Sequence, residues 1–517
     1  MSSAGSRLSV SNGVARRMLG KWIMWLALFA FLLELAFLVR FNRHIGPSFL
    51  SSLPSMSQYL SLSPSYLKQT SQEDGGLNDD KVATISSSRQ RCINLMEQQD
   101  ALNYSRDFSK QPVVVLFHET QGVDKCAVGC TFSPMVSHEV KPDAAFGIHE
   151  QPGVARVLRS MESAVYYGVN DVATAHRFAK ITIIYILMGY NVVMTTSLSS
   201  DVPVGYFSWA EYDIMAPLEK KTEKSMAAAF ISNCGANNFR LDALVELQNL
   251  GITVDSYGSC HRNVHRGSVN KIKALQGYKF SLAFENSIEE DYVTEKYWQS
   301  LVAGTVPVVI GAPNIQDFAP ASNTVIHIKN MEEVKFAATE MKYLVSNETV
   351  YNETLRWKVV GPSDAFKALV DMSAVHSSCR LCIHLATKIR LQEEALLDLS
   401  KKRSCRCTEN SESWFHLYVR ERNRFEMESL YLRSNNLTMR ALQEAIIETF
   451  NSKTHVPIWK SERPTVLKGD NSLKVYKVYP MGSTQHDALY TRQLDTDEDL
   501  KNMVENTPCL KLEVIFV

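Results

Sequence analysis

The sequence predicts an α/β protein whose strands form parallel, doubly wound sheets. Between residues 228 and 328, strand-like segments alternate with segments whose apolar residues recur at helical spacing. The predicted strands are continuous apolar runs, as expected for strands covered by helices on both faces. Repeated strand-then-helix order with buried strands indicates parallel pairing.

In order, the expected elements are strand 228–232, helix 240–250, strand 252–255, helix 268–275, strand 278–284, helix 294–302 and strands 306–310 and 325–328. The first three make one βαβ unit, and Gly251 ends its helix. In the helix after residue 294, the pairs Tyr297/Leu301 and Trp298/Val302 fall at helical spacing, and Gly304 marks the end.

Two further regions flank this one. A first α/β lobe is expected over 111–217, because 111–117 is a short apolar run rich in β-branched residues. After about residue 391 the sequence predicts a small α+β domain. Its expected elements are strands 414–420 and 429–433, helix 438–450, and strands 474–479 and 512–517. This ββαββ order is reminiscent of a β-grasp fold.

An 18-residue apolar stretch at 22–39 has the length of one membrane span. Glu34 costs on the order of 3 kcal/mol there, but eleven Leu, Ile, Phe and Val residues each return about 0.3 to 0.6 kcal/mol. No small-residue cleavage site follows, so we expect an uncleaved signal anchor. Basic residues are more numerous in 1–21 than just after the span, which favours a cytosolic N-terminus and a lumenal body. The polar, Ser-rich residues 40–110 then form a stem.

Ten cysteines all follow the predicted span, and an oxidising lumen lets them pair. The Cys379-X-X-Cys382 and Cys405-X-Cys407 pairs also have the spacing of a four-thiolate zinc site, but the lumenal orientation favours disulfides. Cys234 with Cys260, which bracket the βαβ unit, is the expected pair. Four Asn-X-Ser/Thr triplets agree with a lumenal address and predict glycosylation at Asn103, Asn347, Asn352 and Asn436.

Charge and motifs exclude several functions. The 55 basic and 55 acidic side chains cancel, and no long basic run occurs, so nucleic acid binding has no electrostatic support. No G-x-G-x-x-G or P-loop pattern supports nicotinamide or ATP chemistry. His118 and His327 end predicted strands, and we interpret them as structural.

The segment from Phe284 to Tyr297 joins the end of a strand to the start of a helix. Helix N-termini at the carboxyl edge of a parallel sheet offer unpaired N–H groups and a partial positive charge to an anion. Lys296 lies in that first helical turn, where its cation can neutralise a diphosphate. Tyr292 and Glu295 can stack on, or accept hydrogen bonds from, the group that the diphosphate carries.

Residues 284–313, FENSIEEDYVTEKYWQSLVAGTVPVVIGAP, closely resemble the signature of the α1,3-fucosyltransferases. Further matching segments are 160–164, 194–206, 231–235 and the Cys379/Cys382 pair, so that the resemblance covers roughly residues 110–410. The pattern is most similar to the plant-type core enzymes, which fucosylate the asparagine-linked GlcNAc of N-glycans. The resemblance implies a GT-B architecture of two Rossmann-like lobes, an acceptor-side lobe at 111–217 and a GDP-fucose-binding lobe at 218–390, with 391–517 as an extension.

The resemblance also implies roles for individual residues. Glu162 matches the glutamate that acts as the base on the acceptor hydroxyl, and Arg240 with Lys296 matches the cations that hold the donor diphosphate. Tyr292 and Glu295 match donor-contacting positions beside the lysine. Glu285 and Asn286 either cap the next turn or contact the fucose and ribose hydroxyls.

The acidic runs 289–291 and 495–499 could attract Mn²⁺ or Mg²⁺, but solvated loops are expected instead. Because the site has its own cations, no metal is strictly required, and stimulation by Mn²⁺ or Mg²⁺ is the most that we expect.

The predicted function is that of a single-pass type II Golgi membrane enzyme. It moves fucose from GDP-fucose to O3 of the innermost GlcNAc of N-glycosylated glycoproteins, with inversion. Two alternatives stay open: a Lewis-type enzyme acting on antennary GlcNAc, and a non-catalytic lumenal glycan-binding protein.

Overall fold

The computed structural model describes residues 90–99, 104–117, 126–134, 141–147, 151–177, 189–265, 267–396, 403–409, 412–468, 475–480, 485–487, 489, 494 and 496–517. The predicted membrane span at 22–39 lies outside these residues, as do Asn103 and His118. So does 178–188, an 11-residue apolar stretch that is too short for a second membrane span. Within the described ranges, no helix has both the length and the apolar character needed to cross a bilayer.

The first sheet has five parallel strands in the order β2-β1-β3-β4-β5. They are β1 Val113–Leu116, β2 Cys130–Ser133, β3 Ala144–Phe146, β4 Ala155–Arg159 and β5 Val192–Met194, and helix α3 (Val172–Arg177) precedes β5. Val113, Val115 and Val157 are fully buried in the core of this lobe. The parallel sheet predicted for the first lobe is therefore confirmed.

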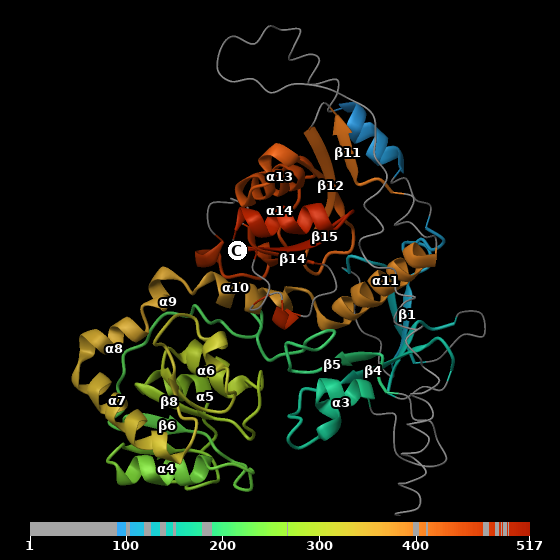
Figure 1. Ribbon diagram of the computed structural model, residues 1–517. Coiled ribbons are helices and arrows are strands. Elements are labelled where there is room, and N and C mark those ends of the chain that lie inside the picture. The colour runs from blue at the N-terminus through green and yellow to red at the C-terminus, as the bar shows by residue number, and fades with distance from the viewer. Residues whose placement is uncertain are drawn as a thin grey trace, which may run out of the picture. The chain divides into compact units, whose positions relative to one another are not determined.

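Helix α11 (Ser377–Leu396) follows the second lobe in sequence but packs against the first sheet (Figure 1). Leu381 and Leu385 lie in the same core as the first-sheet valines. Disulfides join Cys379 to Cys126 and Cys382 to Cys130, which fixes the helix to the start of β2 and to the segment just before it.

The second sheet is also entirely parallel, in the order β10-β9-β8-β6-β7. Its strands are β6 Ala227–Ala229, β7 Val254–Ser256, β8 Phe280–Phe284, β9 Val306–Ile310 and β10 Ile326–His327. Its helices are α4 Arg240–Asn249, α5 Lys271–Gln276, α6 Glu295–Ala303, α7 Val334–Ser346 and α8 Glu348–Thr354, and α9 Trp357–Val360 and α10 Asp364–Asp371 follow.

Helices cover both faces of this second sheet (Figure 1). On one face, Leu244 of α4 and Met341 of α7 share a core with Phe280 of β8. On the other face, Trp298 of α6 packs with Ala283, whose side chain points the opposite way from that of Phe280 because side chains alternate along a strand. The predicted doubly wound sheet is confirmed.

The prediction for helix α6 is confirmed closely. The helix spans Glu295–Ala303, and Gly304 ends it in the left-handed conformation, with φ +64°. A side chain at Gly304 would be strained at that φ and would also clash with Leu218.

The third sheet is mixed. Its four long strands are β12 Glu412–Glu421, β13 Glu428–Arg433, β14 Val475–Pro480 and β15 Lys511–Phe516. They lie in the order β13-β12-β15-β14, and only the central pair, β12 and β15, is parallel. Helix α13 (Met439–Ser452) buries Leu442 and Ile446 against the sheet, and α14 (Asp497–Asn506) precedes β15. This order agrees with the predicted resemblance to a β-grasp fold.

All ten cysteines lie in described residues, and all are paired. The five disulfides are Cys92–Cys407, Cys126–Cys379, Cys130–Cys382, Cys234–Cys260 and Cys405–Cys509. The prediction for Cys234 and Cys260 is confirmed. The four-thiolate zinc alternative is wrong, because each of its four sulfurs is bonded to a cysteine outside that set.

Candidate active site

The second sheet reverses its strand order between β6 and β8, since the chain runs outward from β6 to β7 and then returns to β8. In open α/β sheets, ligands bind outside the carboxyl ends of the strands at such a reversal. The loops that follow β6 and β8 carry the Cys234 disulfide and the 284–296 segment, respectively. The loop after β8 contains predicted site residues, and Arg240 begins helix α4 directly after the loop that follows β6.

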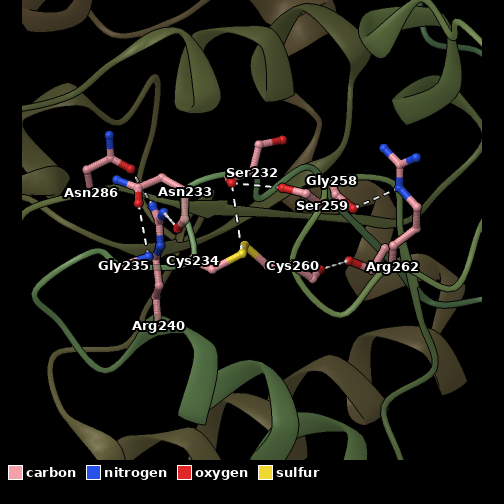
Figure 2. Close-up of a disulfide and its surroundings, with 11 residues drawn as sticks. Ser232, Asn233, Cys234, Gly235, Arg240, Gly258, Ser259, Cys260, Arg262 and Asn286 are labelled. Carbon is pink, nitrogen blue, oxygen red and sulfur yellow. Dashed lines mark hydrogen bonds between the residues drawn. A yellow bond between two sulfur atoms is a disulfide. The ribbon is translucent and has the colours of Figure 1, made fainter.

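Arg240 joins these two loops (Figure 2). One terminal nitrogen, Nη1, donates to the carbonyl of Phe284 at 3.1 Å and to Asn286 Oδ1 at 2.7 Å. The other, Nη2, donates to the carbonyl of Asn233. The side chain is only 2% exposed, and burial lowers its pKa. Arg240 was predicted to contact the donor diphosphate, but in this structure its guanidinium braces the ends of β6 and β8.

The Cys234–Cys260 disulfide lies next to this brace and joins the loop after β6 to the loop after β7 (Figure 2). The Ser259 hydroxyl donates to the carbonyl of Ser232 at 2.8 Å, adding a second link between the same loops. Asn233, which accepts from Arg240, immediately precedes Cys234. The disulfide therefore helps to hold the carbonyl on which Arg240 depends.

Glu285 leaves the end of β8 and turns back onto the start of α6. Its Oε1 accepts from the Thr294 backbone N–H at 2.8 Å, and the Thr294 hydroxyl bonds to both carboxylate oxygens at 2.8 and 2.9 Å. The side chain of Glu285 is 2% exposed. Gly311 leaves room for it, since a Cβ there would lie 2.9 Å from Glu285 Cγ. Of the two alternatives for Glu285, the structure shows the capping contact.

Lys296 lies where it was predicted, in the first turn of α6. Its Nζ pairs with Glu285 Oε2 at 3.1 Å and with Glu295 Oε1 at 3.2 Å, and 19% of its side chain is exposed. Burial lowers the pKa of Lys296, but the charges of Glu285 and Glu295 outweigh it and raise the pKa above its ordinary value. The residue therefore presents a permanent cation beside the N-terminus of the helix.

The other two predicted donor contacts in the loop are Tyr292, which is buried, and Asn286, which is half-buried. Tyr292 is 3% exposed, and burial followed by the charge of Glu285 raises its pKa. Its ring therefore lies within the protein rather than on a surface open to stacking. Asn286 is half-buried, and its side-chain oxygen accepts from Arg240.

Glu162 lies in a turn that follows the carboxyl end of β4. Its backbone is fixed, because Asn170 donates its amide to the Glu162 carbonyl at 2.8 Å and the Glu162 N–H donates to the Ser160 hydroxyl at 3.3 Å. The carboxylate itself is exposed, and no residue in the described ranges hydrogen-bonds to it. This is a suitable state for a group that must accept a proton from a bound alcohol.

Tyr206 connects the Glu162 turn to the Lys296 cluster electrostatically. Burial raises the pKa of Tyr206, the charges of Glu162 and Glu295 raise it further, and the charge of Lys296 lowers it. Its hydroxyl donates to the carbonyl of Met161, next to Glu162, at 3.4 Å. The charges of the predicted base and of the predicted donor-site cation therefore both change the pKa of one hydroxyl group.

Direct bonds also join the two segments. The Ser163 hydroxyl donates to Glu289, and the Val165 N–H donates to the same carboxylate oxygen at 3.4 Å. The Tyr166 hydroxyl donates to the carbonyl of Asn286 at 3.3 Å and accepts from the Asn237 N–H at 3.0 Å. The 284–296 segment and the Glu162 turn therefore adjoin.

Two neighbours of the site were not predicted. Tyr206 ends one of the segments that carried the family resemblance, so that signal could have identified it. Lys271 begins α5 and is half-buried, and its charge lowers the pKa of Glu295 as that of Lys296 does. No motif marks Lys271, because its closeness depends on how α5 packs beside α6.

The acidic run 289–291 is only partly the solvated loop that we predicted, because Glu290 is exposed and Glu289 is half-buried. Asp291 is buried, and its carboxylate accepts from the Leu198 N–H at 2.7 Å and from Asn314 Nδ2 at 2.9 Å. Its φ of +63° places the backbone in the left-handed region. Glu290, Asp291 and His486 are close enough together to hold a cation, but hydrogen bonds already occupy both oxygens of Asp291. The metal prediction stays a prediction.

Three predicted glycosylation sites lie in described residues. Asn352 in α8 and Asn436 after β13 are exposed. Asn347 is half-buried, and its side-chain oxygen caps α8 by accepting from the Val350 N–H at 3.2 Å. His327 is half-buried at the end of β10, and burial lowers its pKa.

Comparison with known proteins gives a family match over the second lobe. Residues 218–401 match the model described as glycosyltransferase family 10 (fucosyltransferase), C-terminal. A putative fucosyltransferase-like protein of Arabidopsis thaliana is 49% identical over 516 residues, which cover 100% of this chain and 95% of that protein.

More distant relatives match shorter stretches. GDP-fucose protein O-fucosyltransferase 3 of Xenopus laevis is 33% identical over 33% of this chain and 41% of its own length. A 4-galactosyl-N-acetylglucosaminide 3-alpha-L-fucosyltransferase of Pan troglodytes is 33% identical over 33% of this chain and 48% of its own length. Among solved structures, an alpha1,3-fucosyltransferase with GDP-fucose aligns with a TM-score of 0.34 and 16% identity, covering 52% of this chain and 88% of that one.

Proposed function

This chain belongs to glycosyltransferase family 10, the fucosyltransferases, and we propose that it transfers L-fucose from GDP-fucose to the asparagine-linked GlcNAc of N-glycans. The bond forms at O3 of that GlcNAc, in α1,3 linkage. The anomeric carbon of fucose is inverted.

The observation that carries this proposal is the position of Lys296. Its cation lies at the N-terminus of α6, beside the point where the sheet reverses its strand order, and its charge reaches the same tyrosine hydroxyl as that of Glu162. A diphosphate bound at this helix end would contact unpaired N–H groups and a fixed cation. The sugar that it carries would then face the Glu162 turn.

The transfer breaks the bond between the fucose anomeric carbon and the GDP oxygen and forms a bond from that carbon to O3 of GlcNAc. Glu162 takes the proton from the O3 hydroxyl as that oxygen attacks. The electron pair of the broken bond leaves with GDP, whose added negative charge Lys296 and the helix N-terminus stabilise. Because the acceptor attacks opposite the leaving group, one carboxylate is enough and the product is inverted.

The proposal includes a location in the Golgi lumen and a single N-terminal membrane anchor. Five disulfides suit an oxidising compartment, and two exposed Asn-X-Ser/Thr triplets suit the same one. No metal enters the mechanism, since Lys296 and the helix supply the positive charge. Addition of Mn²⁺ or Mg²⁺ is expected to stimulate at most.

A second candidate keeps the donor and changes the acceptor to an antennary GlcNAc. It is favoured by the similarity to the 4-galactosyl-N-acetylglucosaminide 3-alpha-L-fucosyltransferase over a third of the chain. A non-catalytic glycan-binding protein is the third candidate. The exposed Glu162 carboxylate, together with the Lys296 cation, weighs against it, because binding alone needs no base.

One assay separates these candidates. The lumenal portion is incubated with GDP-fucose and two N-glycopeptides, one with a bare core and one with extended antennae, and mass spectrometry locates the new fucose. Fucose on the asparagine-linked GlcNAc supports the proposal. Fucose on the antennae or on the peptide assigns another acceptor, and no fucose on either substrate contradicts enzymatic function.

A further inference from the structure

Three consecutive residues after the Glu162 turn carry large side chains into solvent. Val165 is 53% exposed, Tyr166 43% and Tyr167 57%. Burying such side chains is normally favourable, by about 1.5 to 3 kcal/mol for a large apolar one. Three in succession at the surface, beside the proposed base, are therefore a candidate contact surface for a ligand.

The backbone beneath these residues is well fixed. The N–H groups of Tyr166 and Tyr167 both donate to the Ser163 carbonyl, at 3.2 and 3.0 Å. The Ser163 hydroxyl is bound by Glu289, and the Tyr167 carbonyl accepts from the Asn170 N–H at 2.7 Å. The exposed side chains are thus presented on a rigid turn.

The two tyrosines differ in what they bond. The Tyr166 hydroxyl bridges Asn286 and Asn237, so this ring spans the loops at the donor site. Tyr167 makes no side-chain hydrogen bond to any residue in the described ranges, and its ring is the more exposed. A structural role therefore accounts for Tyr166 but not for Tyr167.

Ile288 adds a third apolar group from the other lobe. It lies in the 284–296 segment between Asn286, which the Tyr166 hydroxyl contacts, and Glu289, which the Val165 N–H contacts. Its side chain is exposed. Val165, Tyr167 and Ile288 therefore lie around the junction of the two segments. We call these three residues the rim cluster.

We propose that the rim cluster is the acceptor platform, on which the N-acetylhexosamine to be fucosylated lies with its apolar face against Tyr167. This inference rests on the proposed function. Asn170 links Tyr167 to Glu162 on one turn, because its backbone N–H donates to the Tyr167 carbonyl at 2.7 Å and its side-chain amide donates to the Glu162 carbonyl at 2.8 Å. A sugar on the Tyr167 ring would therefore have hydroxyls near the Glu162 carboxylate. Val165 and Ile288 offer apolar contact to an acetamido methyl group.

The size and the surroundings of the rim cluster favour a sugar over a protein partner. Three side chains form a much smaller patch than the roughly 800 Å² that each partner contributes to a standard protein interface. Glu162, Glu289 and Asn286 border it and can accept hydrogen bonds from hydroxyl groups. Aromatic rings beside such acceptors suit a ligand with one apolar face and a polar edge.

The test compares Tyr167→Ala with Tyr167→Phe. For each variant we would measure the KM for a core N-glycopeptide, the KM for GDP-fucose, and the slow hydrolysis of GDP-fucose without acceptor. Tyr167→Ala should raise the acceptor KM about tenfold, leaving the other two unchanged, and Tyr167→Phe should behave as wild type. Tyr343→Ala, at an equally exposed tyrosine on α7, is the matched control and should change nothing.

An unchanged acceptor KM in Tyr167→Ala would overturn the platform, as would an equal rise in the KM for GDP-fucose. Circular dichroism and thermal melting would show that the variant is folded. Failure of the proposed function is distinguishable, because wild-type protein would then form no fucosylated product. In that case, saturation-transfer NMR with the methyl β-glycoside of GlcNAc tests the platform separately. A signal that wild type shows and Tyr167→Ala loses supports the platform. A signal that Tyr167→Ala retains, or the absence of a signal in wild type, contradicts it.

Discussion

The segment after β8 and the turn after β4 each carry part of the proposed chemistry, but they are bonded very differently. In the first, Glu285, Thr294 and Lys296 form a closed set of hydrogen bonds and ion pairs, most of it buried. In the second, only the backbone of Glu162 is held, and its carboxylate is exposed.

The difference matches what each segment has to bind. A diphosphate is best met by charges that are already in place, because the protein then has no reorganisation to make as the leaving group gains charge. An acceptor glycan must enter and leave on a larger molecule, which requires an open approach to the base. We infer that the donor side is preorganised and the acceptor side accessible.

The largest effect should come from a substitution on the accessible acceptor side. Replacing Glu162 with Gln removes the base and preserves the shape of the side chain, so we expect kcat to fall by about 10²- to 10⁴-fold. The KM for GDP-fucose should change little, because the donor contacts lie in the other segment. Steady-state kinetics with a core N-glycopeptide measure both values, and turnover near that of wild type would remove Glu162 from the mechanism.

A smaller effect should follow from a substitution that loosens the preorganised donor side. In the double variant Cys234→Ser/Cys260→Ser, stability should fall by about 3.5 kcal/mol, since the disulfide closes a loop with a sequence separation of 26. The affinity for GDP-fucose should also fall, because the carbonyl of Asn233 that Arg240 holds is no longer fixed by its neighbour. Guanidinium denaturation and calorimetry measure the two effects.

The matched control is Cys405→Ser/Cys509→Ser, which removes a disulfide from the third sheet. This variant should lose at least as much stability and keep its affinity for GDP-fucose. Equal losses of affinity in the two double variants would show that the disulfide next to Arg240 has no specific role at the donor site.

The smallest effect should be on the stability of the fold at acid pH. Burial raises the pKa of Glu295, but the charge and hydrogen bond of Lys296 outweigh it, so the folded-state pKa is lowered. A lowered carboxyl pKa stabilises the fold above the unfolded value, near 4.3, and this stabilisation is lost as pH falls through the folded value. The side chain is 39% exposed, so we expect only about 0.5 kcal/mol.

Urea denaturation of wild type and Glu295→Gln at pH 7 and at pH 3.5 tests this. Wild type should be the more stable at pH 7, and the gap should close at the lower pH. A gap of the same size at both values would mean that the Glu295–Lys296 pair does not stabilise the donor segment through its charge.

The parts of the fold that the sequence predicted are those set by local patterns. Helix α6, its end at Gly304, and strands β8 and β9 follow from apolar spacing and from one glycine. Strand β3 was missed because it has three residues, Ala144–Phe146, and no β-branched side chain. The packing of α11 on the first sheet was missed because it depends on residues more than 250 positions earlier.

The site was predicted in outline but not in its contacts. Lys296 and Glu285 could be placed from the order of strand, loop and helix. The role of Arg240 could not, because two of its three partners are backbone carbonyls, which no side-chain pattern reveals. The buried Asp291 was missed for a related reason, since the Leu198 N–H that it accepts from belongs to the other lobe.

The most direct test is a calorimetric titration of GDP-fucose into Glu162→Gln and Lys296→Met under the same conditions. Lys296→Met removes a charged hydrogen-bond donor, so its affinity should fall by about 10- to 100-fold, and that of Glu162→Gln should stay within about twofold of wild type. Wild-type affinity in Lys296→Met, or a comparable loss in Glu162→Gln, would contradict the division of the site into a preorganised donor side and an open acceptor side.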